Sequence, residues 1–309
     1  MDLIQQTRIT YSAAPKTLLA ALFCAVLLCG CDQEAVENSE TNKSPNRPYW
    51  EITKLERPIS ELTVVAKRSA DQRAAMKLAF EAPSVRPKYA EAHHFLAAKL
   101  YEEALPILTD LATQGYADAQ YDLFIFYDKN NRGQDNLKDD QKSLHWLQKA
   151  IDQGHPAAQA SMADLYHNGK NLLVQLDWAK AAEWMTISAE QGRATAQRAL
   201  GLWYKLGNGV EQDPIESYKW NQLALNRYEN SVSAGVLAQI VENSQGYLID
   251  HFKLTEEQIR QAEQRAAQWE KDHPWAYQSR DDLRNYSWEA PEDFPPPPAV
   301  EAKLSAENQ

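Results

Sequence analysis

Residues 196–228 read AQRALGLWYKLGNGVEQDPIESYKWNQLALNRY, and this stretch determines the fold class. Ala196, Leu200 and Tyr204 are four residues apart, so they share one face of a helix. The segment DPIE at 213–216 is a helix start, with an acidic N-cap, proline at the first position and glutamate at the third. An apolar series with helical spacing follows it. The stretch therefore predicts two helices joined by a short, glycine-rich turn.

The same pattern occurs twice more, upstream and at a nearly constant period. The recurring residues are Ala119, Ala158 and Ala196; Tyr127, Tyr166 and Tyr204; Trp146, Trp184 and Trp220; and Gly115, Gly154 and Gly192. We interpret the Ala, Tyr and Trp as packing residues and the Gly as a left-handed cap that ends each second helix. One hairpin cannot bury its own apolar face, so hairpins must stack. We predict an all-α fold, a right-handed α-solenoid of stacked helical hairpins over residues 89–230, with residues 89–115 as an additional hairpin.

This pattern resembles the Sel1-like repeats, which are relatives of the tetratricopeptide repeats. Residues 200–210 match the LG-x-x-Y-x-x-G-x-G-V core of that family, with Gly201 at the close-packed position. Phe124 and Ala163 replace this glycine in the two earlier copies. The period also exceeds the roughly 34 residues of tetratricopeptide repeats. The resemblance covers half to two-thirds of the chain and implies stacked helix pairs.

The N-terminal sequence predicts where the protein resides. Residues 18–28 (LLAALFCAVLL) form an apolar run that is shorter than the roughly 20 residues of a membrane-spanning helix and suits a signal peptide. The run ends in LCGC at 28–31, which resembles a bacterial lipobox and implies cleavage before Cys31 and lipidation of its thiol. Asp32 resembles an inner-membrane retention signal. We expect a lipid-anchored protein of the cell envelope that faces the periplasm, with the inner membrane favoured over the outer; an ordinary secretory signal is the alternative.

Composition divides the rest of the chain. After the signal peptide (1–30), residues 31–49 are polar and predict a flexible tether. Residues 50–88 predict an N-terminal helical segment, and residues 231–273 predict capping helices that close the array. Residues 274–309 are rich in proline and predict a mostly disordered tail.

Charge and motifs exclude several kinds of function. A net charge of −11 argues against nucleic-acid binding, which needs a basic face. The cysteines are Cys24, Cys29 and Cys31, so the processed chain has no disulfide and no catalytic thiol. No catalytic motif is present, and a zinc site from His94 and His167 is the one metal alternative. We therefore expect no catalytic residue, no cofactor and no metal.

The first helices of such solenoids line the concave face, and positions away from the packed residues are free to bind. The predicted protein-binding groove consists of Tyr121 as an apolar anchor and of Asp128, Asp164, His167, Arg198 and Lys205. Solvated positions without function are the alternative. The predicted function is an interaction scaffold that docks an envelope protein, with an immunity-type inhibitor of a periplasmic toxic effector as a special case. An envelope enzyme that acts on peptidoglycan through a site built across repeats is the second hypothesis.

Overall fold

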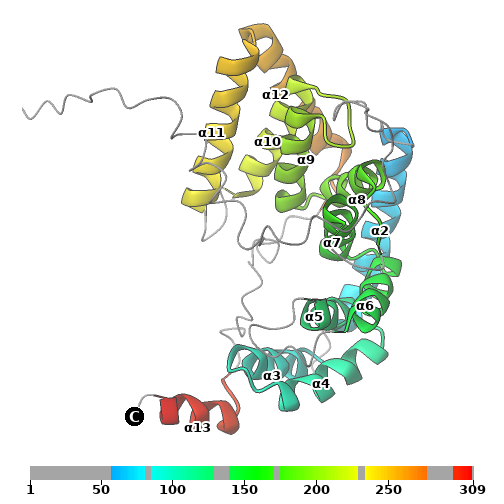
Figure 1. The fold of residues 1–309 in the computed structure, drawn as a ribbon, viewed down its shortest axis with the longest axis vertical. Helices are drawn as coiled ribbons and strands as arrows, with labels where there is room; N and C mark the ends of the chain where they lie inside the picture. Colours follow the sequence, from blue (N-terminus) through cyan, green and yellow to red (C-terminus); the bar gives the residue numbers. More distant parts are fainter. Residues whose placement is uncertain are drawn as a thin grey trace, which may run out of the picture. The chain divides into compact units, whose positions relative to one another are not determined.

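The computed structural model describes residues 57–80, 85–128, 139–169, 174–228, 234–276 and 295–307. Every regular element in these ranges is a helix (Figure 1). The helices are α2 (Ile59–Phe80), α3 (Arg86–Ala97), α4 (Tyr101–Thr113), α5 (Ala117–Asp128), α6 (Asp140–Asp152), α7 (Pro156–Asn168), α8 (Trp178–Glu190), α9 (Ala194–Leu206), α10 (Pro214–Tyr228), α11 (Ala234–Phe252), α12 (Glu256–Asp272) and α13 (Pro298–Glu307). The predicted fold of stacked helix pairs is confirmed. None of the described helices combines the length and the apolar character that crossing a bilayer requires.

The helices stack in chain order. Each helix from α3 to α10 packs against the next one, and α12 packs against α10. Residues 89–115, the predicted additional hairpin, form most of α3 and all of α4. The pairs α5–α6, α7–α8 and α9–α10 correspond to the three copies of the sequence repeat.

The repeated alanines and glycines have the roles that the sequence predicts, and the repeated tryptophans differ in how deeply they are buried. The alanines at 119, 158 and 196 are buried, and Trp220 is fully buried. Trp146 and Trp184 are only partly buried and lie between neighbouring core clusters. The glycines at 115, 154 and 192 have φ of 99°, 77° and 88°, the left-handed conformation that the predicted helix ends require.

The glutamine that follows each repeated alanine forms hydrogen bonds between neighbouring helices. Gln120 donates from Nε2 to the carbonyl of Ala112 at 2.9 Å, and Gln197 donates to the carbonyl of Ala189 at 3.2 Å. Gln159 instead donates to Ser69 Oγ of α2 at 3.1 Å, and its Oε1 accepts a hydrogen bond from Gln191 at 2.6 Å. All three glutamines are buried, so each hydrogen bond replaces water that the side chain has lost.

Helix α2 precedes the repeats in the sequence and packs against α8, the second helix of the pair α7–α8. Leu62 and Ala66 are fully buried against Ile187 of α8. Arg57, just before α2, forms an ion pair with Glu183 at 2.5 Å, across 126 positions of sequence. The sequence predicts a helical segment here but not its docking place, since nothing local to α2 identifies α8.

Part of the C-terminal tail is helical. The composition of residues 274–309 predicts a mostly disordered tail, but residues 298–307 form α13. The chain enters α13 through prolines, which are accepted at the first position of a helix because the N–H there has no intrahelical partner. Val300 is buried in the core cluster of α3 and α4, and Lys303 donates to the carbonyl of Ala98. Residues 277–294, and the predicted signal peptide and tether, lie outside the described residues.

Candidate protein-binding surface

The predicted groove lies on the first helix of each pair, α5, α7 and α9. Tyr121 of α5 is only 4% exposed. Its hydroxyl lies 2.9 Å from Ser161 Oγ, and its ring centroid is 4.7 Å from that of His155 in the next pair. The following pair therefore covers Tyr121, which is a core residue and is not available as the predicted apolar anchor.

The acidic positions are more accessible. Asp164 of α7 is exposed and Asp128 at the end of α5 is half-buried. They belong to successive first helices, α5 and α7. The structure therefore presents Asp164 to solvent and encloses Asp128 partly.

His167 is a packed side chain at the end of α7. Its ring stacks on Trp178 and on Trp203, with centroids 5.6 and 4.9 Å apart and interplanar angles of 18° and 12°. Burial lowers the pKa of His167, and a hydrogen bond with Asn168 opposes this effect only in part. His94 lies in α3, and no group of three or more metal-ligating side chains occurs among the described residues. The His167 ring therefore links α7 to α8 and α9.

Two cations of α9 lie half-buried on the same helix face, Arg198 and Lys205. The Lys205 ammonium lies 4.9 Å from the centroid of the Tyr247 ring in α11. Burial lowers the pKa of Lys205, and no acidic side chain of the described ranges lies within ion-pair distance of it. This lysine is therefore partly desolvated without a compensating negative charge.

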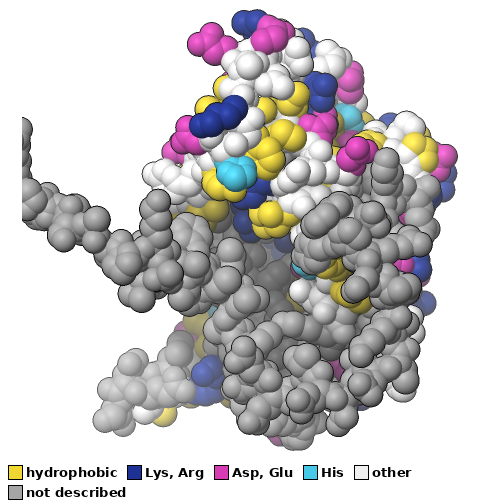
Figure 2. Space-filling view, turned by 45° about the horizontal axis from the view of Figure 1, so that its top comes forward, with side chains coloured by type: hydrophobic (Ala, Val, Ile, Leu, Met, Phe, Trp, Pro, Cys, Tyr) yellow, Lys and Arg dark blue, Asp and Glu magenta, His cyan; other side chains and the backbone are white. Residues whose placement is uncertain are grey.

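Helix α11 follows the repeats and carries exposed apolar side chains that the sequence analysis did not single out. Val236 is 71% exposed, Ile240 46% and Tyr247 47%, and Leu206 at the end of α9 is 49% exposed. His251 stacks on Tyr247 with ring centroids 4.8 Å apart. Figure 2 shows hydrophobic side chains beside histidine and basic side chains on the face that it draws. We call Lys205, Leu206, Val236, Ile240, Tyr247 and His251 the α9–α11 surface.

A pattern in the sequence could have revealed this surface. Val241 and Leu248 are seven residues apart and are fully buried on the side of α11 that faces the core. Positions 236, 240, 247 and 251 follow helical spacing on another side. Only one of the two apolar sides of α11 packs into the core. The other apolar side is therefore exposed.

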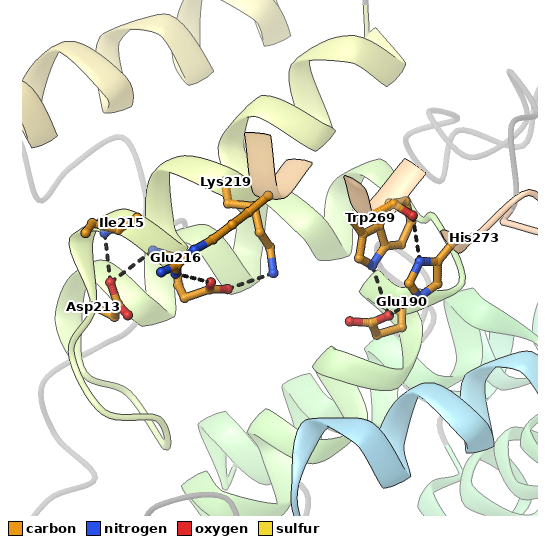
Figure 3. Close-up of polar contacts among 8 residues, drawn as sticks. Glu190, Asp213, Ile215, Glu216, Lys219, Trp269 and His273 are labelled. Carbon is orange, nitrogen blue, oxygen red and sulfur yellow. Dashed lines mark hydrogen bonds and ion pairs between the residues drawn. The ribbon is translucent and has the colours of Figure 1, made fainter. Parts of the chain in front are cut away.

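Polar contacts, one set buried and one partly exposed, hold α12 in place (Figure 3). Trp269 donates from Nε1 to Glu190 at 2.9 Å, and His273 Nε2 lies 2.7 Å from the same carboxylate oxygen. Glu216 of α10 forms ion pairs with Lys219 at 2.7 Å and with Arg265 of α12 at 2.8 Å. These contacts tie α12 to α8 and α10, so their role is structural.

A second histidine–carboxylate pair is buried near the start of the array. Asp122 of α5 accepts a hydrogen bond from the Tyr89 hydroxyl at 2.6 Å, and His93 Nε2 lies 2.9 Å from the same oxygen. Tyr89 and His93 belong to α3, so the contact ties α3 to α5. Sequence reasoning missed both pairs because their members are 29 to 83 positions apart.

Comparison with known proteins identifies the three repeated helix pairs. Residues 117–155, 156–192 and 194–227 each match the family model described as Sel1 repeat. The chain contains three Sel1 repeats. Each repeat corresponds to one helix pair, from α5–α6 to α9–α10, and the resemblance inferred from residues 200–210 is confirmed.

Two curated relatives share part of the chain. A chitin synthase regulator, SKT5 of Malassezia restricta, is 30% identical over 134 residues, which are 43% of this chain and 9% of that protein. An ERAD-associated E3 ubiquitin-protein ligase component, HRD3A of Arabidopsis thaliana, is 35% identical over 68 residues, which are 22% of this chain and 10% of that protein. The chain thus spans about a tenth of the length of the curated relatives it matches.

Two solved structures are also similar. A protective antigen of uropathogenic Escherichia coli with an SLR fold is 28% identical, with a TM-score of 0.47 over 66% of this chain and 43% of that one. A Sel1 repeat protein from Oxalobacter formigenes is 28% identical, with a TM-score of 0.36 over 44% of this chain and 97% of that one.

Proposed function

We propose that this Sel1 repeat protein is an interaction scaffold of the bacterial cell envelope, anchored by lipid at Cys31, which docks a protein partner on its first helices. The observation that carries the proposal is the α9–α11 surface. Exposed apolar residues that the core does not use are typical of protein-binding sites. Sel1 repeats generally mediate protein–protein interaction, so a surface of this kind on the last first helix, α9, and on α11 beside it suits the family.

The relatives support an accessory role. One is named as a regulator and the other as a component of a ligase. The two buried histidine–carboxylate pairs of this chain are engaged in ties between helices, and this favours a scaffold over an enzyme. An inhibitor of a periplasmic effector is a special case of the same function, with the effector as the partner.

The anchor and the location rest on the N-terminal sequence. The 11-residue apolar run, the LCGC ending and Asp32 support a lipoprotein that faces the periplasm, with the inner membrane favoured. A tether of 18 residues (32–49) would span roughly 20–25 Å, enough to hold the repeats away from the lipid headgroups.

Photo-crosslinking in cells tests the proposed function. A photoreactive amino acid is placed at Asp164 or Arg198 on first helices, and at Lys149 on the exposed side of α6 as the control. We expect crosslinks to one protein partner from the first two positions and none from Lys149. Crosslinks of equal yield from all three positions, or none from the first two, would contradict the proposal.

A further inference from the structure

We propose that the α9–α11 surface binds an acidic amphipathic helix of the partner, with a carboxylate of that helix on Lys205 and its apolar side chains over Ile240 and Tyr247. This inference rests on the proposed function and specifies the chemistry of the partner. The apolar contacts, the charge and the form of the ligand each support it.

The apolar part of the surface is not required for folding. Helix α11 is fixed by Val241 and Leu248, both completely buried against α10 and its neighbours. Val236, Ile240 and Tyr247 lie on another side of the same helix and are 46–71% exposed. From 236 to 247 the helix rises about 16 Å, which is three turns. A partner helix of three or four turns would cover this length.

The α9 side of the surface is basic, although the chain as a whole is acidic. The whole chain has a net charge of −11, but α9 contains Arg198 and Lys205 and no acidic residue. Lys205 is half-buried over the Tyr247 ring, and the described residues offer it no carboxylate. The acids of α11, Glu242 and Asp250, do not pair with it. A carboxylate brought by a ligand would supply the missing counter-charge in a partly desolvated place, where ion pairs are stronger than in water.

The form of the ligand follows from the elements that surround the surface. One mode of peptide recognition adds an extended strand to the edge of a sheet, and the described part of the chain offers no such edge because it contains no strand. An exposed helix side with apolar residues at helical spacing, here on α11 beside Lys205 of α9, is the kind of surface that accepts an amphipathic helix. The ligand is therefore a helix with apolar residues on one side and an acid beside them.

A display selection tests this chemistry even while the partner is unidentified. A library of helical peptides of about 16 residues is selected on the full-length chain in detergent. We expect the selected peptides to carry Asp or Glu three or four positions from large apolar residues. Affinity is then measured by fluorescence anisotropy against the wild type, Lys205→Glu, Tyr247→Ala and the control Lys149→Glu on α6.

We expect Lys205→Glu and Tyr247→Ala each to weaken binding at least about tenfold, and Lys149→Glu to leave it unchanged. A peptide whose acid is replaced by lysine should bind the Lys205→Glu variant more tightly than it binds the wild-type protein. Circular dichroism and melting temperature confirm that the variants fold, since both altered side chains are partly exposed.

Three results would overturn the inference: no selected peptide, selected peptides without acids, or binding that is insensitive to both variants. A concentration-dependent dimer that Tyr247→Ala abolishes would also overturn it, because a second copy would then occupy the surface. If crosslinks from Asp164 and Arg198 persist in any of these cases, the proposed function stands and only the chemistry of the ligand is wrong. If peptides bind as expected but no crosslinked partner is found, the proposed function fails instead.

Discussion

Gly154 must be glycine for two independent reasons. Its φ of 77° disfavours any side chain, and a Cβ at this position would lie 2.3 Å from the carbonyl oxygen of Ser69 in α2. We predict that Gly154→Ala lowers the free energy of unfolding by about 2 kcal/mol or more, as measured by urea denaturation. Gly246→Ala is the matched control, since nothing lies within 4 Å of its Cβ inside α11. That control should be neutral or stabilising by up to about 1 kcal/mol; equal losses in both variants would contradict the assignment.

His167 makes stability depend on pH. Because burial lowers its pKa below the ordinary value of 6.5, the folded chain binds this proton less readily than the unfolded chain does. Its contribution to stability is therefore complete above pH 6.5 and declines as the pH falls below that value. We predict that the melting temperature drops less between pH 7.5 and 5.5 in His167→Phe, which keeps the ring between Trp178 and Trp203, than in the wild type. An unchanged drop would mean that His167 does not contribute; the exposed His145→Phe serves as the control.

At the scale of single residues, the sequence predicted what depends on the local backbone. The left-handed glycines and the N-cap at 213 are as expected, with Asp213 Oδ1 accepting from the amides of Ile215 and Glu216. The burial of Tyr121 could not be predicted, because Ser161 and His155 come from the next repeat. Whether a first-helix residue faces solvent depends on how closely the neighbouring pair approaches.

The ionised carboxylate of Glu216 in α10 holds α12 in place through its ion pair with Arg265. Burial raises the pKa of Glu216, but Lys219 and Arg265 outweigh burial, so the pKa lies below its ordinary value of 4.5. The stabilisation is present above that value and is lost as the pH falls through the lowered pKa. We predict that Glu216→Gln costs about 1 kcal/mol or more at pH 7 and that the variant loses less further stability than the wild type between pH 5 and 3. Urea denaturation across this range measures both effects, and parallel curves would contradict the role of Glu216.

Helix α2 stabilises the array through a few apolar residues. Leu62 is completely buried against α8, whereas Val64 on the same helix is 59% exposed. We predict that Leu62→Ala lowers the free energy of unfolding by about 2–5 kcal/mol, because it leaves a cavity, and that Val64→Ala changes it by less than about 0.5 kcal/mol. Similar small effects for both would mean that α2 is not docked in solution.

At the scale of elements, hairpins could be predicted and docking could not. Apolar spacing, caps and turn glycines lie within one repeat unit, so the sequence specifies each helix pair and the stacking of similar pairs. Helices α2 and α13 lack the repeat signature, and their contacts lie 126 positions away at Glu183 and 205 positions away at Ala98. The exposed side of α11 was missed for a related reason, since α11 follows the last recognisable repeat.

At the scale of the whole molecule, the anchor remains a prediction that one variant tests. We expect Cys31→Ala to abolish labelling by a radioactive or clickable fatty acid and to block cleavage before residue 31. Asp32→Ser should move part of the protein towards the outer membrane, as read by density fractionation. Normal processing of Cys31→Ala would contradict the lipoprotein assignment, and an unchanged distribution of Asp32→Ser would leave the inner membrane unsupported.

Helix α2 is synthesised well before α8, the helix against which it packs. Arg57 is translated 126 residues before Glu183, its partner. At roughly 5–20 residues per second, this interval lasts about 6–25 s. During that time Leu62 and Ala66 have no surface to cover them. The buried side of α2 therefore stays uncovered until α8 is available, and a chaperone can hold it during that interval.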